Sequence, residues 1–395
     1  MKKLFFALSL SALLFAGCSK DDGPMPEPVG DEWIDPIFAQ VLQEKGYIEN
    51  ALTVTPSDVK DLTYINVTGD WKFEDEIVIS TGPIKSVRGL EYFESLETLD
   101  CSYNQISELN ASKNTQLTRL DCDYNNLSSL DVSKNTKLTR LWCDRNNLSS
   151  LDVSNNTELT SLECSSNNLS SLDVSNNTEL TKLYCAYNNL SSLVVSNNTK
   201  LTFLYCDSNN LSALDVSNNT ELTELYCGSN NLSALDVSNN TELTELYCGY
   251  NNLSSLDVSK NTELTRLYCY SNNLSSLDVS NNTKLIYLWS YYNNLSELDI
   301  SKNTELSVLY FPFNNLSSLD VSNNTKLTRL ECFGNNLSTI DISHNRNLNY
   351  FSCHDNPGEN GEFVVKAWFD NSSIPNGFTD TGWEGVELIY QNVDK

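Results

Sequence analysis

The sequence is poor in the residues that most enzymes use for catalysis. Its 395 residues include only two histidines, His344 and His354, and both lie near the C-terminal end. No Ser/His/Asp or Cys/His arrangement stands out, whereas an active site needs non-repeated polar side chains that converge in one pocket. We therefore expect a protein that is not an enzyme and that has no cofactor.

Basic residues are also scarce, with 25 Lys and Arg against 52 Asp and Glu, so the formal net charge is −27. Such acidity disfavours nucleic acid and anionic membrane surfaces as partners. Neither the glycine-rich G-G-x-G-x-D calcium repeat nor an EF-hand loop is present, and we expect no metal site. One acidic position recurs, which leaves either a solvated edge, as we expect, or a row that binds divalent cations. Its members are Asp131, Asp152, Asp173, Asp215, Asp236, Asp257, Asp278, Asp299, Asp320 and Asp341.

The apolar run Leu4–Ala16 is too short to cross a membrane as a helix, and it follows Met-Lys-Lys. We expect residues 1–17 to be a secretory signal. Leu14-Phe-Ala-Gly-Cys18 resembles a bacterial lipobox, which implies cleavage before Cys18 and acyl chains on that residue. The alternative is an ordinary secreted protein with a free cysteine.

We expect residues 18–30, which are acidic and contain proline, to form a tether. Ser19–Gly23 resembles the export signal of lipoproteins displayed on the outer leaflet of certain Gram-negative bacteria. The resemblance implies a lipid-anchored protein of the outer membrane that faces the cell exterior.

A 21-residue unit repeats without insertion or deletion from Leu96 to about Asn356. The copy from Leu96 fits L-x-x-L-x-L-x-x-N-x-L, with leucines at two positions, Cys101 at the third and Ile106 at the last. Among thirteen copies the Leu99 position is Leu in twelve and the Asn104 position is Asn in all. This is the leucine-rich repeat pattern. It predicts an α/β-type solenoid that is mostly β, with a parallel concave sheet.

The alternation around Leu99 predicts a short strand with one buried face, and stacked coils pair their strands in parallel. The return path is too short for a regular helix with two turns, so we expect an extended or 3₁₀ convex side. Asn104 and its equivalents, and a second polar column at Ser112–Asn114, are expected to bond the main chain of adjacent coils.

The Cys101 position is Cys in eleven copies, with Ser290 and Phe311 as the exceptions. Free cysteine behaves as a small buried hydrophobe. Stacked neighbours have parallel Cβ vectors about 4.8 Å apart, which is wider than disulfide geometry allows. We therefore expect free thiols, and we expect the volumes of Ser290 and Phe311 to compensate each other.

The unit L-D-V-S-x-N-T-x-L-T-x-L-x-C-x-x-N-x-L, as in Leu130–Leu148, resembles the cysteine-containing repeats of the J-type internalin and of many bacterial surface lipoproteins. The resemblance covers roughly two thirds of the chain, residues 96–358. It implies recognition and adhesion rather than catalysis. It carries over no partner, because partner choice depends on the variable positions.

The flanking segments are expected to cap the repeats. Residues 31–61 predict a helical N-terminal cap, with an Asp35-Pro36 start and a capping box at Thr55-Pro-Ser-Asp58. Residues 62–95 are degenerate repeats with an insertion at 70–76. Residues 359–395 predict a β-containing C-terminal cap, with strands at 363–369 and 386–390 and with Trp368 and Trp383 to cover the last coil.

Aromatic residues gather at the outward strand positions, and exposed aromatics at this density suggest a binding surface. Aromatic residues also favour strands, and repeat duplication copies them without selection, so a purely structural role stays open. Phe203 and Tyr250 belong to the flanking positions. The candidate ligand-binding residues are Trp142, Tyr184, Tyr205, Tyr226, Tyr247, Tyr268, Tyr270, Tyr287, Trp289, Tyr291, Tyr292, Tyr310, Phe313 and Phe333, with the densest patch from Tyr268 to Phe333.

Five arginines border this surface and could pair either with ligand carboxylates or with neighbouring glutamates: Arg119, Arg140, Arg145, Arg266 and Arg329. The sequence thus predicts a lipid-anchored surface protein that binds a protein or a glycan through its concave aromatic face. The alternatives are a structural surface protein without a discrete ligand and a glycan-capture accessory of a nutrient-uptake system.

Overall fold

The computed structural model describes residues 33–74, 77–80, 82–359, 362–380 and 387–394, and Ile34–Lys395 forms one compact unit. The expected signal, Cys18 and the tether lie outside the described residues. Helix α1 (Pro36–Glu44) is capped by Asp35, whose side chain accepts the N–H groups of Ile37 and Phe38 at 2.9 and 3.1 Å. Helix α2 (Pro56–Val59) has the predicted capping box.

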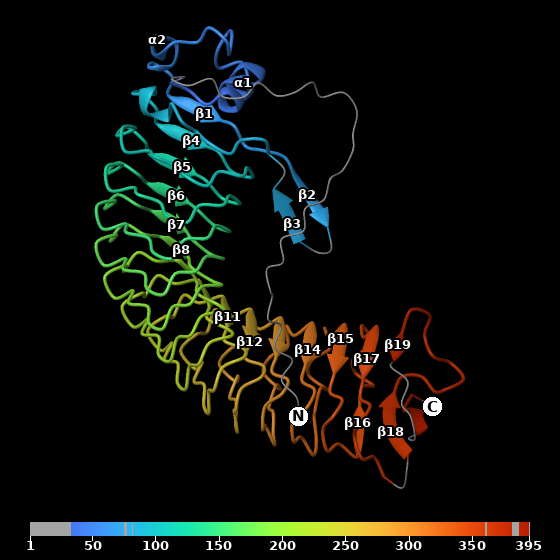
Figure 1. Ribbon diagram of the computed structural model, residues 1–395. Coiled ribbons are helices and arrows are strands. Elements are labelled where there is room, and N and C mark those ends of the chain that lie inside the picture. The colour runs from blue at the N-terminus through green and yellow to red at the C-terminus, as the bar shows by residue number, and fades with distance from the viewer. Residues whose placement is uncertain (1–32, 75–76, 81, 360–361, 381–386, 395) are drawn as a thin grey trace. The chain divides into compact units, whose positions relative to one another are not determined.

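Fifteen strands pair in parallel and in chain order to form one sheet, as Figure 1 shows. The first is β1 (Tyr64–Asn66), which pairs with β4, and 3₁₀ helix η1 (Leu90–Tyr92) follows in the same segment. The sheet continues through β4 (Thr98–Asp100), β5 (Arg119–Asp121), β6 (Arg140–Trp142), β7 (Ser161–Glu163), β8 (Lys182–Tyr184), β9 (Phe203–Tyr205), β10 (Glu224–Tyr226), β11 (Glu245–Tyr247), β12 (Arg266–Tyr268), β13 (Tyr287–Trp289), β14 (Val308–Tyr310), β15 (Arg329–Glu331) and β17 (Tyr350–Ser352).

Each strand from β4 to β15 contributes one central leucine to the core, and its partner in the next coil is the residue 21 positions later, as in Leu99 and Leu120. Both leucines are fully buried. Residues 96–358, all of which the structure describes, contain no helix on the return path, so the extended alternative is correct there. Short β16 (Thr339–Asp341) lies on this path near the end of the array. The predicted mostly β solenoid is confirmed.

The asparagine that follows each strand bonds both neighbouring turns of the main chain. Asn125 donates to the carbonyl oxygens of Cys101 and Cys122 at 3.0 and 3.1 Å. Its Oδ1 accepts the N–H of Ile106, in the preceding coil, at 2.9 Å. The buried N–H and C=O groups at this turn have no partner in a strand. The asparagine amide supplies the hydrogen bonds that they need.

The second asparagine column bonds the opposite turn, as predicted. Asn156 donates to the carbonyl oxygens of Val132 and Asn135 at 3.0 and 2.8 Å, and it is fully buried. The same two bonds recur in successive coils up to Asn345. Asparagine side chains thus form hydrogen bonds between each coil and the preceding one at both ends of the strand.

The eleven repeat cysteines are buried and free, as predicted. Burial raises the pKa of the Cys269 and Cys332 thiols to about 12, so these side chains are neutral members of the core. Ser290 and Phe311 occupy the same column in adjacent coils and are both fully buried. Their adjacency fits the expected volume compensation.

The insertion in the degenerate segment is longer than predicted. Strand β2 (Trp71–Glu74) pairs in antiparallel register with β3 (Ile77–Ser80), so the expected range 70–76 covers only half of a hairpin. The periodicity of the repeats could not reveal the returning strand, because the hairpin lies outside the repeat. Gly69 and Gly82 lie against each other at its base.

The strands of the C-terminal segment join the sheets of the coils. Strand β19 (Thr379–Asp380) extends the main sheet beside β17. Strands β18 (Glu362–Ala367) and β20 (Glu387–Asn392) join β16 in a parallel three-stranded sheet. Trp368 contacts Phe369 and Phe378, whereas Trp383 lies outside the described residues.

Candidate functional site

The sheet places the variable outward residues in regular columns, which together we call the strand face. The strand column is the last residue of each strand, and its members are neighbours in register, as Tyr205, Tyr226, Tyr247, Tyr268 and Trp289 show. The edge column lies two residues later and the left-handed column three residues later. All fourteen candidate residues belong to these columns, except Tyr287, which begins β13.

The rings of the strand column stack on one another along the coils. The Tyr247 ring lies 4.8 Å from Tyr226 and 3.8 Å from Tyr268, with interplanar angles of 26° and 23°. Trp289 covers the far side of Tyr268 in a T-shaped contact at 5.0 Å. Tyr268 is consequently only 6% exposed, so the candidate placed at one end of the densest patch is a buried support for its neighbours.

The most exposed rings of the strand face belong to the left-handed column. Among the described residues, twelve that are not glycine have φ between 50° and 57°, one in each repeat from 96 to 358 except that of Gly334, and each directly precedes the asparagine that follows the strand. Tyr187, Tyr250 and Tyr292 in this column are 54%, 55% and 53% exposed, and Phe313 is 37% exposed. The sequence placed Tyr292 and Phe313 among the candidates and named Tyr250 only as a flanking position. It missed Tyr187, although the position before the invariant asparagine would have revealed it.

Carboxylates occupy the edge column near the first coils, and the sequence did not single them out. Asp123 Oδ1 accepts the N–H of Asp144 at 2.6 Å, and Asp144 Oδ1 accepts the N–H of Ser165 at 2.5 Å. Burial and the charge of Asp144 raise the pKa of Asp123 to about 8. Burial and the charge of Glu163 raise the pKa of Asp144 to about 7.

The arginines that border the strand face are already engaged within the protein. Arg119 pairs with Asp121, Arg266 pairs with Glu245, and Arg329 pairs with Glu331. For these three, pairing with neighbouring carboxylates is therefore the interpretation that the structure supports.

The other two arginines lie over rings. The guanidinium of Arg140 lies 4.6 Å from the centre of the Trp142 ring, and that of Arg145 lies 5.1 Å from Tyr124. Both contacts are within the range of cation–π attraction.

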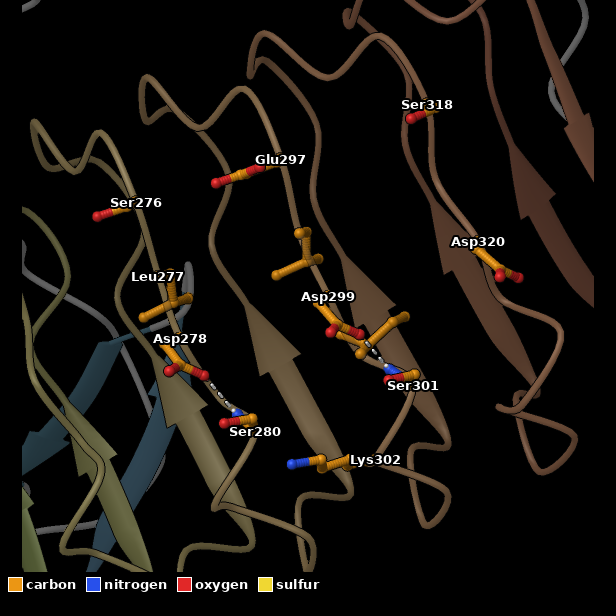
Figure 2. Close-up of a pocket in the computed structure, with 12 residues that line it drawn as sticks. Ser276, Leu277, Asp278, Ser280, Glu297, Asp299, Ser301, Lys302, Ser318 and Asp320 are labelled. Atoms are coloured by element: carbon orange, nitrogen blue, oxygen red, sulfur yellow. Dashed lines mark hydrogen bonds between the residues drawn. The ribbon is translucent and has the colours of Figure 1, made fainter.

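The recurrent aspartates lie on the return path of the coils, and three of them, Asp278, Asp299 and Asp320, line a hollow that Figure 2 shows. The carboxylates of Asp278 and Asp299 accept the N–H groups of Ser280 and Ser301 at 2.9 Å. Bonds from Ser280 lower the pKa of Asp278. Among the described residues no group of His, Cys, Asp or Glu is arranged to hold a metal ion. Each of these two carboxylates caps the turn that follows it.

No helix in the described part of the chain has the length and apolarity needed to cross a membrane. No family model and no curated protein matches the chain.

Solved structures do match. The functional domain of InlJ from Listeria monocytogenes, which includes a cysteine ladder, is 37% identical over 78% of this chain and 67% of that chain, with a TM-score of 0.71. An internalin, inlF, from the same organism is 25% identical over 79% and 92% of the two chains, with a TM-score of 0.68.

A third similarity concerns the fold alone. The leucine-rich repeat ectodomain of the receptor kinase GASSHO1/SCHENGEN3 from Arabidopsis thaliana, in complex with CASPARIAN STRIP INTEGRITY FACTOR 2, is 21% identical. The match covers 79% of this chain and 40% of that chain, with a TM-score of 0.65.

Proposed function

Because the chain belongs to the cysteine-containing leucine-rich repeat family of the internalin InlJ, we propose that it binds a protein partner through its strand face. The observation that carries the proposal is the set of exposed rings in the left-handed column. A non-glycine residue in this backbone region costs on the order of 1 kcal/mol. Four coils have serine there, Ser166, Ser208, Ser229 and Ser271, so the turn itself does not require an aromatic residue.

The arrangement of the rings favours a protein over a glycan. A sugar ring stacks on a free aromatic face. Tyr247 has a ring on each face, and Tyr292 and Phe313 cover one face of each other at 4.5 Å and 5°. Such stacks present ring edges and hydroxyl groups, which suit the mixed polar and apolar surface of a protein. A glycan ligand, or no ligand at all, are the alternatives that the experiment separates.

The test uses the full-length protein and a variant with Tyr250→Ser, Tyr292→Ser and Phe313→Ser. Serine occurs naturally in this column, so the variant keeps the fold. Both proteins are assayed on an array of host cell-surface proteins and on a glycan array, with Val194→Ser, an exposed apolar position outside the strand face, as control.

We expect binding to a member of the protein array that falls at least tenfold in the triple variant and is unchanged in the control. Binding only to glycans would replace the protein partner by a sugar. Equal binding by all three proteins, or no binding on either array, would contradict the proposal.

We further propose that the protein is displayed by a lipid anchor on Cys18, in the outer membrane and facing the cell exterior. The lipobox-like residues before Cys18 and the acidic residues after it support this proposal. Acyl chains supply stable anchoring when more than one is attached. Mass spectrometry of the N-terminal peptide, with Cys18→Ser as control, tests the modification. Protease treatment of intact cells tests the exposure.

A further inference from the structure

The hairpin β2–β3 has an outer side that no described strand covers. In the part of the chain that the structure describes, β2 and β3 pair in antiparallel register with each other and with no other strand (Figure 1). The outer side of such a strand carries main-chain N–H and C=O groups that can pair with another chain. A two-stranded hairpin alone is marginally stable in water, and further strands add stability.

The base of the hairpin is fixed to the first coil. The N–H groups of Gly69 and Gly82 donate to the carbonyl oxygens of Ser102 and Tyr103 at 2.8 and 3.2 Å. A Cβ atom on either glycine would lie 2.6 or 2.7 Å from the Cα of the other, so the two arms leave the coil side by side. At about 3.3 Å per residue, the hairpin extends roughly 20 Å from this base.

The main chain of β2 points alternately toward β3 and toward the outer side. Only two residues connect the strands, so Glu74 and Ile77 form the closing pair of a two-residue hairpin. A closing pair of this kind exchanges both of its hydrogen bonds. The main chain of Lys72 and Glu74 is therefore directed toward β3, and that of Phe73, between them, is directed outward.

The residues of β2 are complementary to the same residues in the opposite direction. When Phe73 lies opposite Phe73 of a second copy, Lys72 lies opposite Glu74 and Glu74 lies opposite Lys72. Opposite charges and aromatic residues directly across an antiparallel pair are stabilising. Two charges of one sign would protect an exposed edge better, because they would repel a second copy.

The same register brings apolar residues of the two copies together. Within the hairpin Trp71 lies opposite Ser80, and Phe73 lies opposite Val78. These residues share one face of the hairpin, and a twofold axis through the Phe73 pair keeps that face on the same side in both copies. Strand β3 has no charged residue, so its sequence offers no comparable register.

We propose that β2 pairs in antiparallel register with β2 of a second copy of this chain, with Phe73 at the twofold axis and two reciprocal Lys72–Glu74 pairs. The result is a four-stranded sheet in the order β3–β2–β2–β3. Lys72 also interacts within its own chain, and the three donors of its ammonium group leave capacity for a second carboxylate. The dimer does not depend on the proposed function, although it would present two strand faces on one particle.

Sedimentation equilibrium of the full-length chain measures the association. In 0.15 M NaCl, charges farther apart than about 8 Å are largely screened, so the net charge of −27 on each copy does not keep the hairpins apart. We expect the average mass to rise from 44.3 kDa toward twice that value as the protein concentration increases from about 1 to about 100 µM.

Charge reversal tests the register. Lys72→Glu and Glu74→Lys each place like charges opposite one another at both pairs, and each is expected to weaken association by about tenfold or more. The double variant with both changes restores opposite charges and is expected to dimerise like the wild type. An equal mixture of the two single variants is also expected to form dimers, because each supplies the charge that the other lacks.

Lys134→Glu, a charge reversal at an exposed residue outside the hairpin, is the control and is expected to leave the association unchanged. Circular dichroism checks that every variant is folded. A wild-type chain that stays monomeric up to about 100 µM, or single variants that dimerise like the wild type, would overturn the proposal.

Failure of the double variant or of the mixture to dimerise would also overturn the proposal, because pairing in this register predicts both. If deletion of residues 70–81 abolished the dimer while Lys72→Glu did not weaken it, the contact would lie on β3, and the assignment to β2 would be wrong.

Discussion

Asn146 Oδ1 accepts the backbone N–H of Leu127, in the preceding coil, at 3.0 Å. The same side chain donates to the carbonyl oxygens of Cys122 and Cys143 at 3.0 and 3.2 Å. One amide thus satisfies three buried main-chain groups from two coils. No other side chain of similar size has both a donor pair and an acceptor, which explains why this position is asparagine in every copy.

Replacing Asn146 by alanine is expected to lower the free energy of unfolding by about 2–4 kcal/mol, because buried main-chain groups lose their partners. Urea denaturation measures the change. The exposed neighbour Asn147 is the control, and its replacement by alanine is expected to cost less than about 0.5 kcal/mol. Equal effects at the two positions would refute the role assigned to the buried amide.

The pH dependence of stability tests the carboxylates of the edge column. The pKa of Asp144 is raised to about 7 in the folded protein, above an unfolded value of about 3.9. The folded state therefore holds the proton more tightly, and stability falls as the pH rises from about 4 to about 7. Asp144→Asn is expected to remove this loss and to gain about 1–2 kcal/mol at pH 8, as measured by denaturation at pH 5 and pH 8.

Asp131 supplies the comparison for this prediction. Its pKa is lowered by bonds from Ser133, so any stability that it contributes is lost as the pH falls, which is the opposite sign. If Asp144→Asn were no more stable than the wild type at pH 8, the strain attributed to these carboxylates would be absent.

The buried cysteine column is expected to react slowly with alkylating agents. Burial raises the pKa of every repeat cysteine, and a thiol rather than a thiolate reacts slowly with alkylating agents. We expect the eleven repeat cysteines to resist iodoacetamide at pH 8 in the native protein and to react completely in guanidinium chloride. Mass spectrometry counts the modified residues. Rapid native labelling of Cys101–Cys353, or disulfides between successive coils, would contradict the buried free column.

The repeat made most of the fold predictable, because a period of 21 fixes which residues become neighbours in the sheet. Leu99, Asn104 and Cys101 each define a column, and the register follows without further information. The caps were less predictable. Asp35 and Thr55 carry helix signals in their own sequence, but the hairpin β2–β3 depends on a strand that the repeat pattern does not contain.

The site was predictable by column but not by exposure. The sequence placed Tyr268 and Tyr292 among the candidates alike, yet one is buried and the other is more than half exposed. The difference arises from ring stacking between coils and from the left-handed turn before the asparagine. Neither is visible in the alternation of polar and apolar residues. Asp123 and Asp144 escaped notice because a carboxylate two residues after a strand resembles any solvated turn.

Ser290 and Phe311 test packing in the core column. Both are fully buried in adjacent coils, one smaller and one larger than the cysteine found elsewhere. Phe311→Cys is expected to cost about 2–4 kcal/mol by leaving a cavity. Ser290→Cys in the same molecule fills part of that space, so the double variant is expected to be more stable than the sum of the single changes by about 0.5–1.5 kcal/mol. Strict additivity in urea denaturation would show that the two residues do not compensate.

The two ends of hairpin β2–β3 are close enough for the hairpin to be deleted and the chain rejoined. A Cβ atom at Gly69 would lie 2.6 Å from the Cα of Gly82, so the two Cα atoms are within about 4 Å of each other, close to the spacing of consecutive residues. Gly69 and Gly82 also donate to the carbonyl oxygens of Ser102 and Tyr103 at 2.8 and 3.2 Å, and both bonds survive removal of the loop.

Deleting residues 70–81 and joining Gly69 to Gly82 is therefore expected to change the free energy of unfolding by less than about 1 kcal/mol, because in the part of the chain that the structure describes β2 and β3 form a two-stranded sheet of their own. Urea denaturation and circular dichroism measure the result. As a control, Gly69→Val in the intact chain is expected to destabilise strongly, since its side chain would meet the carbonyl oxygen of Tyr103. A large loss of stability in the deletion would mean that the hairpin supports the first coil.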